Sequence, residues 1–474
     1  MKNRSRILFI SCLALLFSLL LSAFAIHSFA DESATIIYEF DKQTSDLPGY
    51  GAGKITITPG TNSRKTGWYV VCFADADGVL TDCEPIASVA IKGKAVTIGM
   101  PYGVYLPEKA TRIVLFEGAV KSIDTSDASK AVASFDIPAS KKLTLSKSSL
   151  TFASVSDVHL NYDAHNYGAS AKWTAALNFF DKQGVDMVVV SGDLTESGGV
   201  SDYNRYTNAV SASSFPIDKI YEAKGNHDSP ENAYFMFTTK GKDQIHPYSN
   251  SPYFHLLKKG EGGAKDNLFI FMAQELKATN ASATQDNFST QQLDWLEDLL
   301  IRYSGTNTNI FIIEHAMMRN FGPGDRVNGA YGEPIVLDEK FPGNMRFKAL
   351  LTEYKEAILM SGHTHLSFYE MLNFSDENGT AARMIHNSST CQPRSYTASG
   401  SISYNSEGAT TITKGSEGYI VSVCDDYILY TGYNLTTGKI IPRACYLLSS
   451  YSENRDDVVS ISLKKAPDKT VYAA

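Results

Sequence analysis

In the stretch LMSGHTHLSF (residues 359–368), a short apolar run that is typical of a strand is followed directly by Ser-Gly and then by His363 and His365. The whole chain of 474 residues contains only 10 histidines. A structural histidine rarely has a second one beside it, whereas imidazole is a common ligand of transition metals. The pair therefore indicates a metal site at the end of a strand.

Four other apolar runs between residues 150 and 315 end in similar residues. These runs alternate with helical patterns, which predicts an α/β core. In open α/β sheets, ligands bind beyond the carboxyl ends of the strands. The side chains expected at this edge are Asp157, His159, Asp193, Asn226, His227, Asp228, His315, His363 and His365.

The chain changes character on either side of this core. Residues 31–148 contain short β-like runs broken by Gly, Pro, Asp and Ser, which is typical of a small β-sandwich. After about residue 366 the pattern returns to hairpin-like strands. We therefore predict an N-terminal β-sandwich-like domain over 31–148 and a catalytic domain over 149–474, which includes a β-rich extension over about 391–474.

Residues 1–30 have the pattern of a secretory signal peptide. Basic residues precede an apolar run over 7–26, and Ser28 and Ala30 fit cleavage before Asp31. We expect a secreted or cell-surface protein. Because about twenty apolar residues also suffice to span a bilayer, an uncleaved N-terminal membrane anchor is the alternative, and no further transmembrane stretch follows.

Composition restricts the partners. The formal net charge is −8 and there is no long run of Lys or Arg, so we expect no stable nucleic-acid binding. A small phosphorylated substrate held by metal is compatible with this charge. No cysteine lies in a C-x-x-C zinc pattern, and Cys72 and Cys83 are candidates to face each other across neighbouring strands.

The donor set suits two divalent or trivalent cations. Imidazole together with carboxylate favours zinc, iron or manganese, whereas an all-oxygen set would favour magnesium or calcium. One carboxylate that bridges two ions holds them about 3.5–4 Å apart, the spacing of two-metal phosphoryl chemistry. The glycines before Asp193, Asn226 and His363 are expected to let the backbone turn sharply at the site.

The motifs D-x-H, G-D, G-N-H-D, a lone H and G-H-x-H, in this order, resemble those of the calcineurin-like metallophosphoesterase superfamily over about residues 150–370. The resemblance implies a four-layer αββα sandwich whose second sheet the C-terminal strands complete. It also suggests an immunoglobulin- or fibronectin-like N-terminal module, as in some secreted members.

The resemblance further implies a role for each strand-end residue. The first metal would be bound by Asp157, His159 and His365. Asp193 would be the bridging carboxylate, and the second metal would be bound by Asn226, His315 and His363. His227, oriented by Asp228, would contact the phosphate and assist the leaving group, although Asp228 taken alone also fits a helix cap.

Position 196 bears on the branch of the superfamily. Purple acid phosphatases carry a tyrosine that binds ferric iron three residues beyond the bridging aspartate, and here that residue is Glu196. The segment GDLTESGG (residues 192–199) is closer to the branch that includes bacterial cyclic-nucleotide phosphodiesterases. We therefore favour that branch.

Three residues outside the motifs are further candidates. Arg319 and Arg326 lie in a glycine-rich stretch and are candidates to bind the substrate phosphate, with an ordinary solvated loop as the alternative. His386 ends a predicted strand, where it either lies near the site or packs in the core.

Together these features predict a secreted dinuclear-metal phosphoesterase that hydrolyses phosphodiesters or small phosphomonoesters. In the implied mechanism two cations lower the pKa of a shared water, and the bridging hydroxide attacks phosphorus in line with the leaving alcohol. His227 assists the leaving oxygen. The alternatives are a non-catalytic secreted binding or adhesion protein with a relic hydrolase core, and an extracellular nuclease, which the acidic charge disfavours.

Overall fold

The structure is a computed structural model. It describes residues 33–42, 47–160, 168–229, 231–238, 242–249, 251–275, 288–319, 321–324, 337, 341–370, 373–396, 402–403 and 415–449. The predicted signal peptide and Arg326 lie outside these ranges. None of the helices within them is long and apolar enough to span a membrane.

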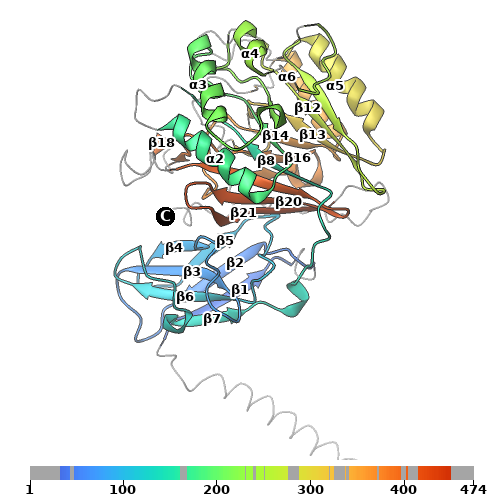
Figure 1. The fold of residues 1–474 in the computed structure, drawn as a ribbon. Helices are drawn as coiled ribbons and strands as arrows, with labels where there is room; N and C mark the ends of the chain where they lie inside the picture. Colours follow the sequence, from blue (N-terminus) through green and yellow to red (C-terminus); the bar gives the residue numbers. More distant parts are fainter. Residues whose placement is uncertain are drawn as a thin grey trace, which may run out of the picture.

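Two six-stranded sheets form the α/β core (Figure 1). The first has the order β10-β9-β8-β19-β20-β21, with the bounds β8 Leu150–Val155, β9 Met187–Val190, β10 Ile220–Glu222, β19 Glu417–Val423, β20 Tyr427–Asn434 and β21 Lys439–Ser449. The second has the order β11-β12-β13-β14-β16-β15, with the bounds β11 Phe254–Lys258, β12 Asp266–Phe271, β13 Thr308–Ile313, β14 Ile358–Ser361, β15 Phe374–Ser375 and β16 Arg383–His386. A short hairpin, β17 Ser395–Tyr396 and β18 Ile402–Ser403, stands apart from both.

The two sheets pack face to face through one apolar layer. Phe152 of β8 meets Phe269 and Phe311 of the second sheet edge-on, with ring centroids 5.1 and 5.4 Å apart. Helices cover the outer faces: α2 Ala169–Gln183, α3 Val200–Ser211 and α4 Glu231–Thr238 on the first sheet, and α5 Thr290–Tyr303 and α6 Pro342–Glu353 on the second. The core therefore has four layers in the order helix, sheet, sheet, helix.

The C-terminal strands divide between the sheets, which differs from the expectation that they complete the second one. Strands β15 and β16 extend the second sheet, but β19 pairs with β8 and carries β20 and β21 into the first. Ile420 and Val421 of β19 lie opposite Ala153 and Phe152. Residues 417–449 are therefore an integral part of the core.

Local sequence explains the helix ends. Trp173, Leu177 and Phe180 form the buried face of α2, and Gly184 ends the helix with a φ of 71°, a left-handed conformation that glycine adopts without strain. Ser289 caps α5 by accepting a hydrogen bond from the Gln292 amide. The Gln292 side chain does not bond back to the Ser289 amide, as it would in a capping box, but bonds the backbone of residue 273.

The described residues between 34 and 137 form two antiparallel sheets. One contains β1 Thr35–Phe40, β2 Gly53–Thr58 and β5 Val96–Met100, and the other contains β3 Trp68–Ala74, β4 Ala87–Ala90, β6 Arg112–Gly118 and β7 Ala133–Asp136. An apolar cluster from both sheets fills the space between them. Their immunoglobulin- or fibronectin-like character stays a prediction. Cys72 and Cys83 do not pair: both are free and buried, in different apolar clusters.

This N-terminal unit packs against the outer edge of β21, below β20 and β21 in Figure 1. The Tyr105 amide donates to the Cys445 carbonyl at 2.8 Å, and the Leu447 amide donates to the Gly103 carbonyl at 2.9 Å. Tyr105, Cys445 and Leu447 are buried in one cluster at this contact. The open edge of the first core sheet is thus covered, as stable sheets require.

Candidate metal centre

The predicted ligands follow five strands whose carboxyl ends meet at one edge of the core. Parallel pairing of β8, β9 and β10 in one sheet, and of β13 and β14 in the other, sets this arrangement. Backbone hydrogen bonds tie the loops beyond the strands together: Val158 N donates to Asp193 O at 2.9 Å, and Gly362 N donates to His315 O at 2.9 Å. Side chains scattered from residue 157 to residue 365 therefore gather at one place.

The backbone at this edge is strained. Six non-glycine residues in the described part of the chain have a positive φ, and five of them are predicted ligands. They are Asp157 (54°), His159 (48°), Asp193 (54°), His363 (76°) and His365 (56°). Such conformations are unfavourable for residues with a side chain and concentrate at functional sites.

The three glycines beside the ligands act differently from one another. Gly192 has a φ of 86° and needs the left-handed region. Gly225 and Gly362 do not have positive φ, but a Cβ at these positions would collide with Asp193 Oδ1 and with Ser156 Oγ, respectively. The expected sharp turn therefore holds for Gly192, whereas the other two permit close approach of backbone to ligand loops.

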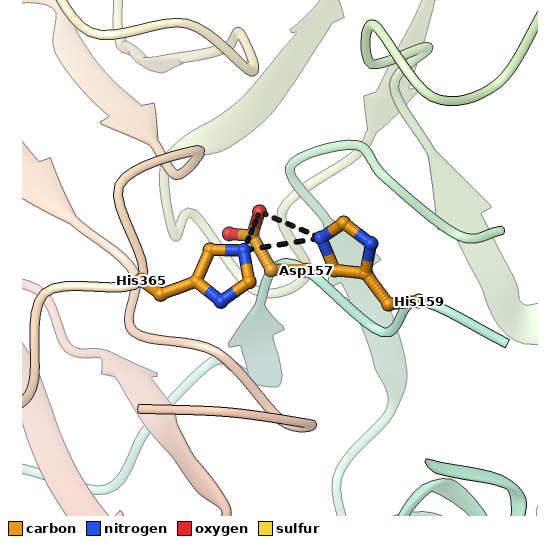
Figure 2. Close-up of side chains that lie close together, drawn as sticks. All are labelled: Asp157, His159 and His365. Carbon is orange, nitrogen blue, oxygen red and sulfur yellow. Dashed lines mark hydrogen bonds and ion pairs between the residues drawn. The ribbon is translucent and has the colours of Figure 1, made fainter. Parts of the chain in front are cut away.

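Asp157, His159 and His365 form the first ligand cluster (Figure 2). Asp157 Oδ1 lies 3.2 Å from His365 Nε2 and 3.6 Å from His159 Nε2, and the two Nε2 atoms are 3.1 Å apart. His365 Nδ1 lies 3.0 Å from the Gln392 carbonyl. Because a carbonyl only accepts, Nδ1 carries the proton and the Nε2 lone pair points at the cluster, as in a metal ligand.

Asp193, His315 and His363 form the second cluster, with Asn226 beside it. His315 Nδ1 donates to the Ser191 carbonyl at 2.7 Å, so that Nε2 is again the atom with the lone pair. This Nε2 lies 3.0 Å from Asp193 Oδ2, 3.0 Å from Asn226 Oδ1 and 3.2 Å from His363 Nδ1. All four side chains thus aim ligand atoms at one point.

The two clusters share Asp193. Its Oδ2 atom lies 3.0 Å from His315 Nε2 and 3.6 Å from His159 Nε2, so that it stands between the two clusters. Its Oδ1 atom accepts a hydrogen bond from the His227 amide at 2.9 Å. This is the position that a bridging carboxylate needs.

The arrangement fits two bound cations better than it fits hydrogen bonds. Asp157 Oδ1 is buried and has no hydrogen-bond partner among the described residues. Two imidazole nitrogens face each other at 3.1 Å in the first cluster and at 3.2 Å in the second, and buried polar atoms without a partner are costly. Cations at the two points would satisfy these atoms, and the mixed imidazole and carboxylate donors suit zinc, iron or manganese.

The charges of the ligands follow from burial and from their neighbours. Burial lowers the pKa of His363 and of His365 to about 3, helped by the charges of His315 and of Arg394, respectively. Burial also opposes the charged form of His159 and His315, but nearby carboxylates raise the pKa of these two histidines to about 10 and about 9. Although burial acts to raise the pKa of Asp193, the nearby histidines lower it strongly.

Glu196 has a direct role that the sequence did not reveal. Its Oε2 atom lies 2.8 Å from His159 Nδ1, on the side of the ring away from the cluster. A carboxylate in this position fixes the tautomer and orientation of a metal-binding histidine and increases its basicity. Sequence reasoning used Glu196 only as a departure from the purple acid phosphatases.

His227 and Asp228 lie side by side but do different things. His227 Nδ1 donates to the Glu196 carbonyl at 2.6 Å, which leaves Nε2 for a ligand in the cavity. Asp228 is fully buried and accepts from the amides of Leu194, Thr195 and Gly225 at 3.2, 3.1 and 3.0 Å. Its bonds brace the ligand loops, so the orienting role predicted for Asp228 falls to the Glu196 carbonyl.

A cavity of about 210 Å³ opens above the clusters. It is lined by His159, Asp193, Glu196, Asn226, His227, His363, His365, Cys391, Gln392 and Arg394. The predicted phosphate ligand Arg319 is half-buried and is not among the described residues that line it. Sequence reasoning missed Gln392 and Arg394, which lie in an irregular segment without a motif.

His386 belongs to the packing behind the site. It is fully buried at the end of β16, and its Nε2 atom lies 2.9 Å from the Gly362 carbonyl and 2.9 Å from Thr364 Oγ1. His386 thus supports the loop that carries His363 and His365. It does not line the cavity in the described structure.

Comparisons with known proteins find similarity to one family. The sequence profile of the calcineurin-like phosphoesterase family matches residues 150–367. No curated protein sequence gives a significant match. Similar solved structures include a dimetal phosphatase from Danio rerio (10% identity, TM-score 0.42, covering 64% of this chain and 100% of that one) and a purple acid phosphatase from yellow lupin (12% identity, TM-score 0.42, covering 88% and 74%).

Similarities this distant do not resolve the branch of the family. The profile match covers the five motifs, and the structure gathers the residues of these motifs into two buried clusters that share one carboxylate. Residues 150–367 therefore belong to a calcineurin-like metallophosphoesterase domain, which is that of a metal-dependent phosphoric ester hydrolase.

Proposed function

We propose that this chain is a secreted or cell-surface phosphoesterase that hydrolyses small phosphomonoesters or phosphodiesters with two metal ions. The observation that carries the proposal is the position of Asp193 between two buried clusters at the floor of an open cavity. Bound cations would supply an activated water and withdraw charge from the phosphoryl oxygens. Iron, zinc and manganese all suit the donor atoms.

The side chains around the clusters have different expected roles in positioning the ligands and in assisting the leaving group. Glu196 and the Gln392 carbonyl hold His159 and His365 in the orientation that a metal requires. His227, held through Nδ1 by the Glu196 carbonyl, offers Nε2 to the leaving oxygen. Asp228 keeps the loops of Asp193 and Asn226 together by accepting their backbone amides.

Two alternatives are less well supported. A relic hydrolase that only binds other molecules is expected to have lost a ligand, whereas all seven predicted ligands here meet at one place. A nuclease needs a positively charged track for its substrate, and the net charge is −8. A small phosphorylated substrate, without stable nucleic-acid binding, therefore remains our proposal for the partner.

The location outside the cytoplasm rests on the sequence of residues 1–30 alone. The basic start, the apolar run and the small residues before Asp31 support a cleaved signal peptide, with an uncleaved membrane anchor as the alternative. Intact mass of the protein from its native host, in the medium and in the membrane fraction, distinguishes a chain that begins at Asp31 from one that keeps the apolar run.

Turnover of p-nitrophenyl phosphate and of its bis-ester, with Zn²⁺, Mn²⁺ or Fe²⁺ added, tests the proposed activity. His227→Ala is expected to lower kcat by about 10²–10⁴-fold, the usual contribution of a general acid, without loss of metal. His255→Ala, which changes a half-buried histidine on β11, is the matched control. A His227→Ala protein that retains the parent rate would refute the role of this residue, and a metal-loaded parent without turnover would refute the activity.

A further inference from the structure

Gln392 and Arg394 form a wall of the cavity that the family profile does not cover, because the match ends at residue 367. Backbone hydrogen bonds fix this wall to the ligand loop. Arg394 N donates to His365 O at 2.7 Å, and Ser367 N donates to Arg394 O at 2.8 Å. With the bond from His365 Nδ1 to the Gln392 carbonyl at 3.0 Å, the wall is positioned directly against a metal ligand.

The Gln392 side chain presents an amide donor at this wall. Gln392 is only 1% exposed, and its Oε1 atom accepts a hydrogen bond from Arg394 Nη2 at 3.2 Å. Because a guanidinium group can only donate, this bond shows that Oε1 of the Gln392 amide faces Arg394 and that the NH₂ group of the amide faces away from Arg394. That Nε2 atom has no hydrogen-bond partner within the described ranges, although buried donors are normally paired.

Arg394 adds a positive charge to this donor. The other ionised side chains that line the cavity in the described structure are the carboxylates Asp193 and Glu196, besides the histidines. A guanidinium group and an amide NH₂ side by side are suited to bind an anionic oxygen.

The geometry of a tetrahedral phosphoryl group indicates which substrate oxygen Gln392 and Arg394 would bind. Of its four oxygens, one belongs to the leaving group, which His227 would serve, and two would face the two ligand clusters if each bound cation takes one oxygen. The fourth oxygen is negatively charged in a monoester, but carries a second substituent in a diester. Only the charged oxygen matches a buried amide donor next to an arginine.

We propose that Gln392 and Arg394 bind the unesterified fourth oxygen of the substrate and make this enzyme a phosphomonoesterase. The inference rests on the proposed function and narrows its substrate class. The cavity volume of about 210 Å³ is below the roughly 300–1,000 Å³ of sites that enclose drug-sized ligands. It accommodates a phosphoryl group and leaves the leaving alcohol to extend outward, whereas a second ester group would have to displace buried Gln392.

Three variants of the full mature chain test the wall. Arg394→Met removes the charge, Arg394→Lys keeps the charge without the planar fork, and Gln392→Glu replaces the NH₂ donor with an acceptor. Arg205→Met, at an exposed position on α3, is the matched control. For each protein we would measure metal content, kcat/KM for p-nitrophenyl phosphate and for its bis-ester, and the affinity of the metal-loaded protein for inorganic phosphate by calorimetry.

Arg394→Met and Gln392→Glu are expected to lower monoester kcat/KM and phosphate affinity by about 10–100-fold, the range for a hydrogen bond to a charged group. The kcat/KM for the diester should fall by a smaller factor. The monoester kcat/KM of Arg394→Lys should lie between those of the parent and Arg394→Met. Metal content should be unchanged in all variants, and all measured values should be unchanged in the control. An equal fall for monoester and diester, or an unchanged phosphate affinity, would overturn the inference.

The phosphate measurement separates this inference from the proposed function. If the metal-loaded parent turns over neither ester, the proposed activity is refuted. Weaker phosphate binding by the variants than by the parent would still support phosphate binding by Gln392 and Arg394. Equal phosphate binding would still overturn it. If Arg394→Met does not fold or loses metal, Arg394→Lys and Gln392→Glu decide the question by the same comparison.

Discussion

Asp193 is the single side chain on which both ligand clusters depend. Its Oδ2 atom lies 3.0 Å from His315 Nε2 and 3.6 Å from His159 Nε2, and its Oδ1 atom is held by the His227 amide. Nearby histidines keep the pKa of this buried carboxyl low despite burial. The negative charge at the centre of the site is therefore present at all ordinary pH values.

We expect Asp193→Asn to lose both metal ions and, with them, turnover, because a neutral amide cannot replace a shared carboxylate. Elemental analysis and p-nitrophenyl phosphate hydrolysis measure the two effects. Asp186→Asn, at the opposite end of β9, is the matched control: Asp186 is exposed and accepts a hydrogen bond from Thr151 N at 2.8 Å. An Asp193→Asn protein that keeps two ions would contradict the bridging role.

Glu196 is expected to set the affinity of the first cluster. Replacing a carboxylate that supports a metal-binding histidine usually costs about 10–100-fold in metal affinity. Glu196→Ala should therefore weaken one of two binding steps in a metal titration by this factor, and Glu196→Gln, which retains an acceptor for His159 Nδ1, should weaken it less. Equal affinities in all three proteins would show that the bond at 2.8 Å has no such role.

Metal binding should release protons at neutral pH. In the metal-free protein, the pKa of His159 is raised to about 10 and that of His315 to about 9, so both are protonated at pH 7 and must lose a proton to bind a cation. Metal affinity should therefore rise with pH up to about these values. Calorimetry in buffers of different ionisation enthalpy measures the released protons, and a heat independent of the buffer would contradict this account.

The loops between strands and helices set the geometry of the site. A Cβ at Gly225 would collide with Asp193 Oδ1 and also with the Asp193 backbone nitrogen. We expect Gly225→Ala to lower the free energy of unfolding by about 1–3 kcal/mol, the usual cost of overpacking, and to weaken metal binding. Gly199→Ala is the control, because a Cβ there meets only Ser201 Oγ at 3.6 Å. Urea denaturation should show a lower free energy of unfolding, and metal titration a lower metal affinity, for Gly225→Ala than for Gly199→Ala.

Elements with a strong pattern could be predicted from the sequence, whereas others could not. The buried strand MVVV of β9 and the apolar face of α2 follow directly from the order of residues. Strands β4, β5 and β11 were missed because they are short and only partly buried. Helix α3 was missed because polar residues and tyrosines obscure its apolar face.

Long-range pairing was harder to predict. Strand β19 pairs with β8, from which it is separated by more than half of the chain, and no local pattern identifies that partner. The metal ligands were accessible to prediction because each follows a recognisable strand. Gln392 and Arg394 follow no strand directly and become part of the site only through their bonds to the His365 loop.

At the scale of the whole molecule, the N-terminal sheets and the core are joined through β21. The bonds at Tyr105 and Leu447 and the apolar cluster around them cover the last strand of the first sheet. This contact lies away from the ligand clusters, because β21 is at the opposite edge of the sheet from β9 and β10. Its expected role is therefore stability of the core.

A chain that begins at residue 149 should expose the edge of β21 and the side chains of Cys445 and Leu447. Exposed edges and apolar surface favour aggregation, so we expect a lower Tm and larger particles in light scattering than for a chain that begins at residue 31. The same Tm and a monodisperse truncated protein would show that the contact contributes little. Metal content of the truncated protein, measured before it aggregates, should remain at two ions.

We expect residues from five strand ends to hold two cations, one on either side of Asp193. Anomalous diffraction from crystals of the metal-loaded protein, collected at the absorption edge of the bound metal, tests it most directly. We predict two peaks about 3.5–4 Å apart, one at Asp157, His159 and His365 and the other at Asn226, His315 and His363. A single peak, or peaks that do not flank Asp193, would contradict the account.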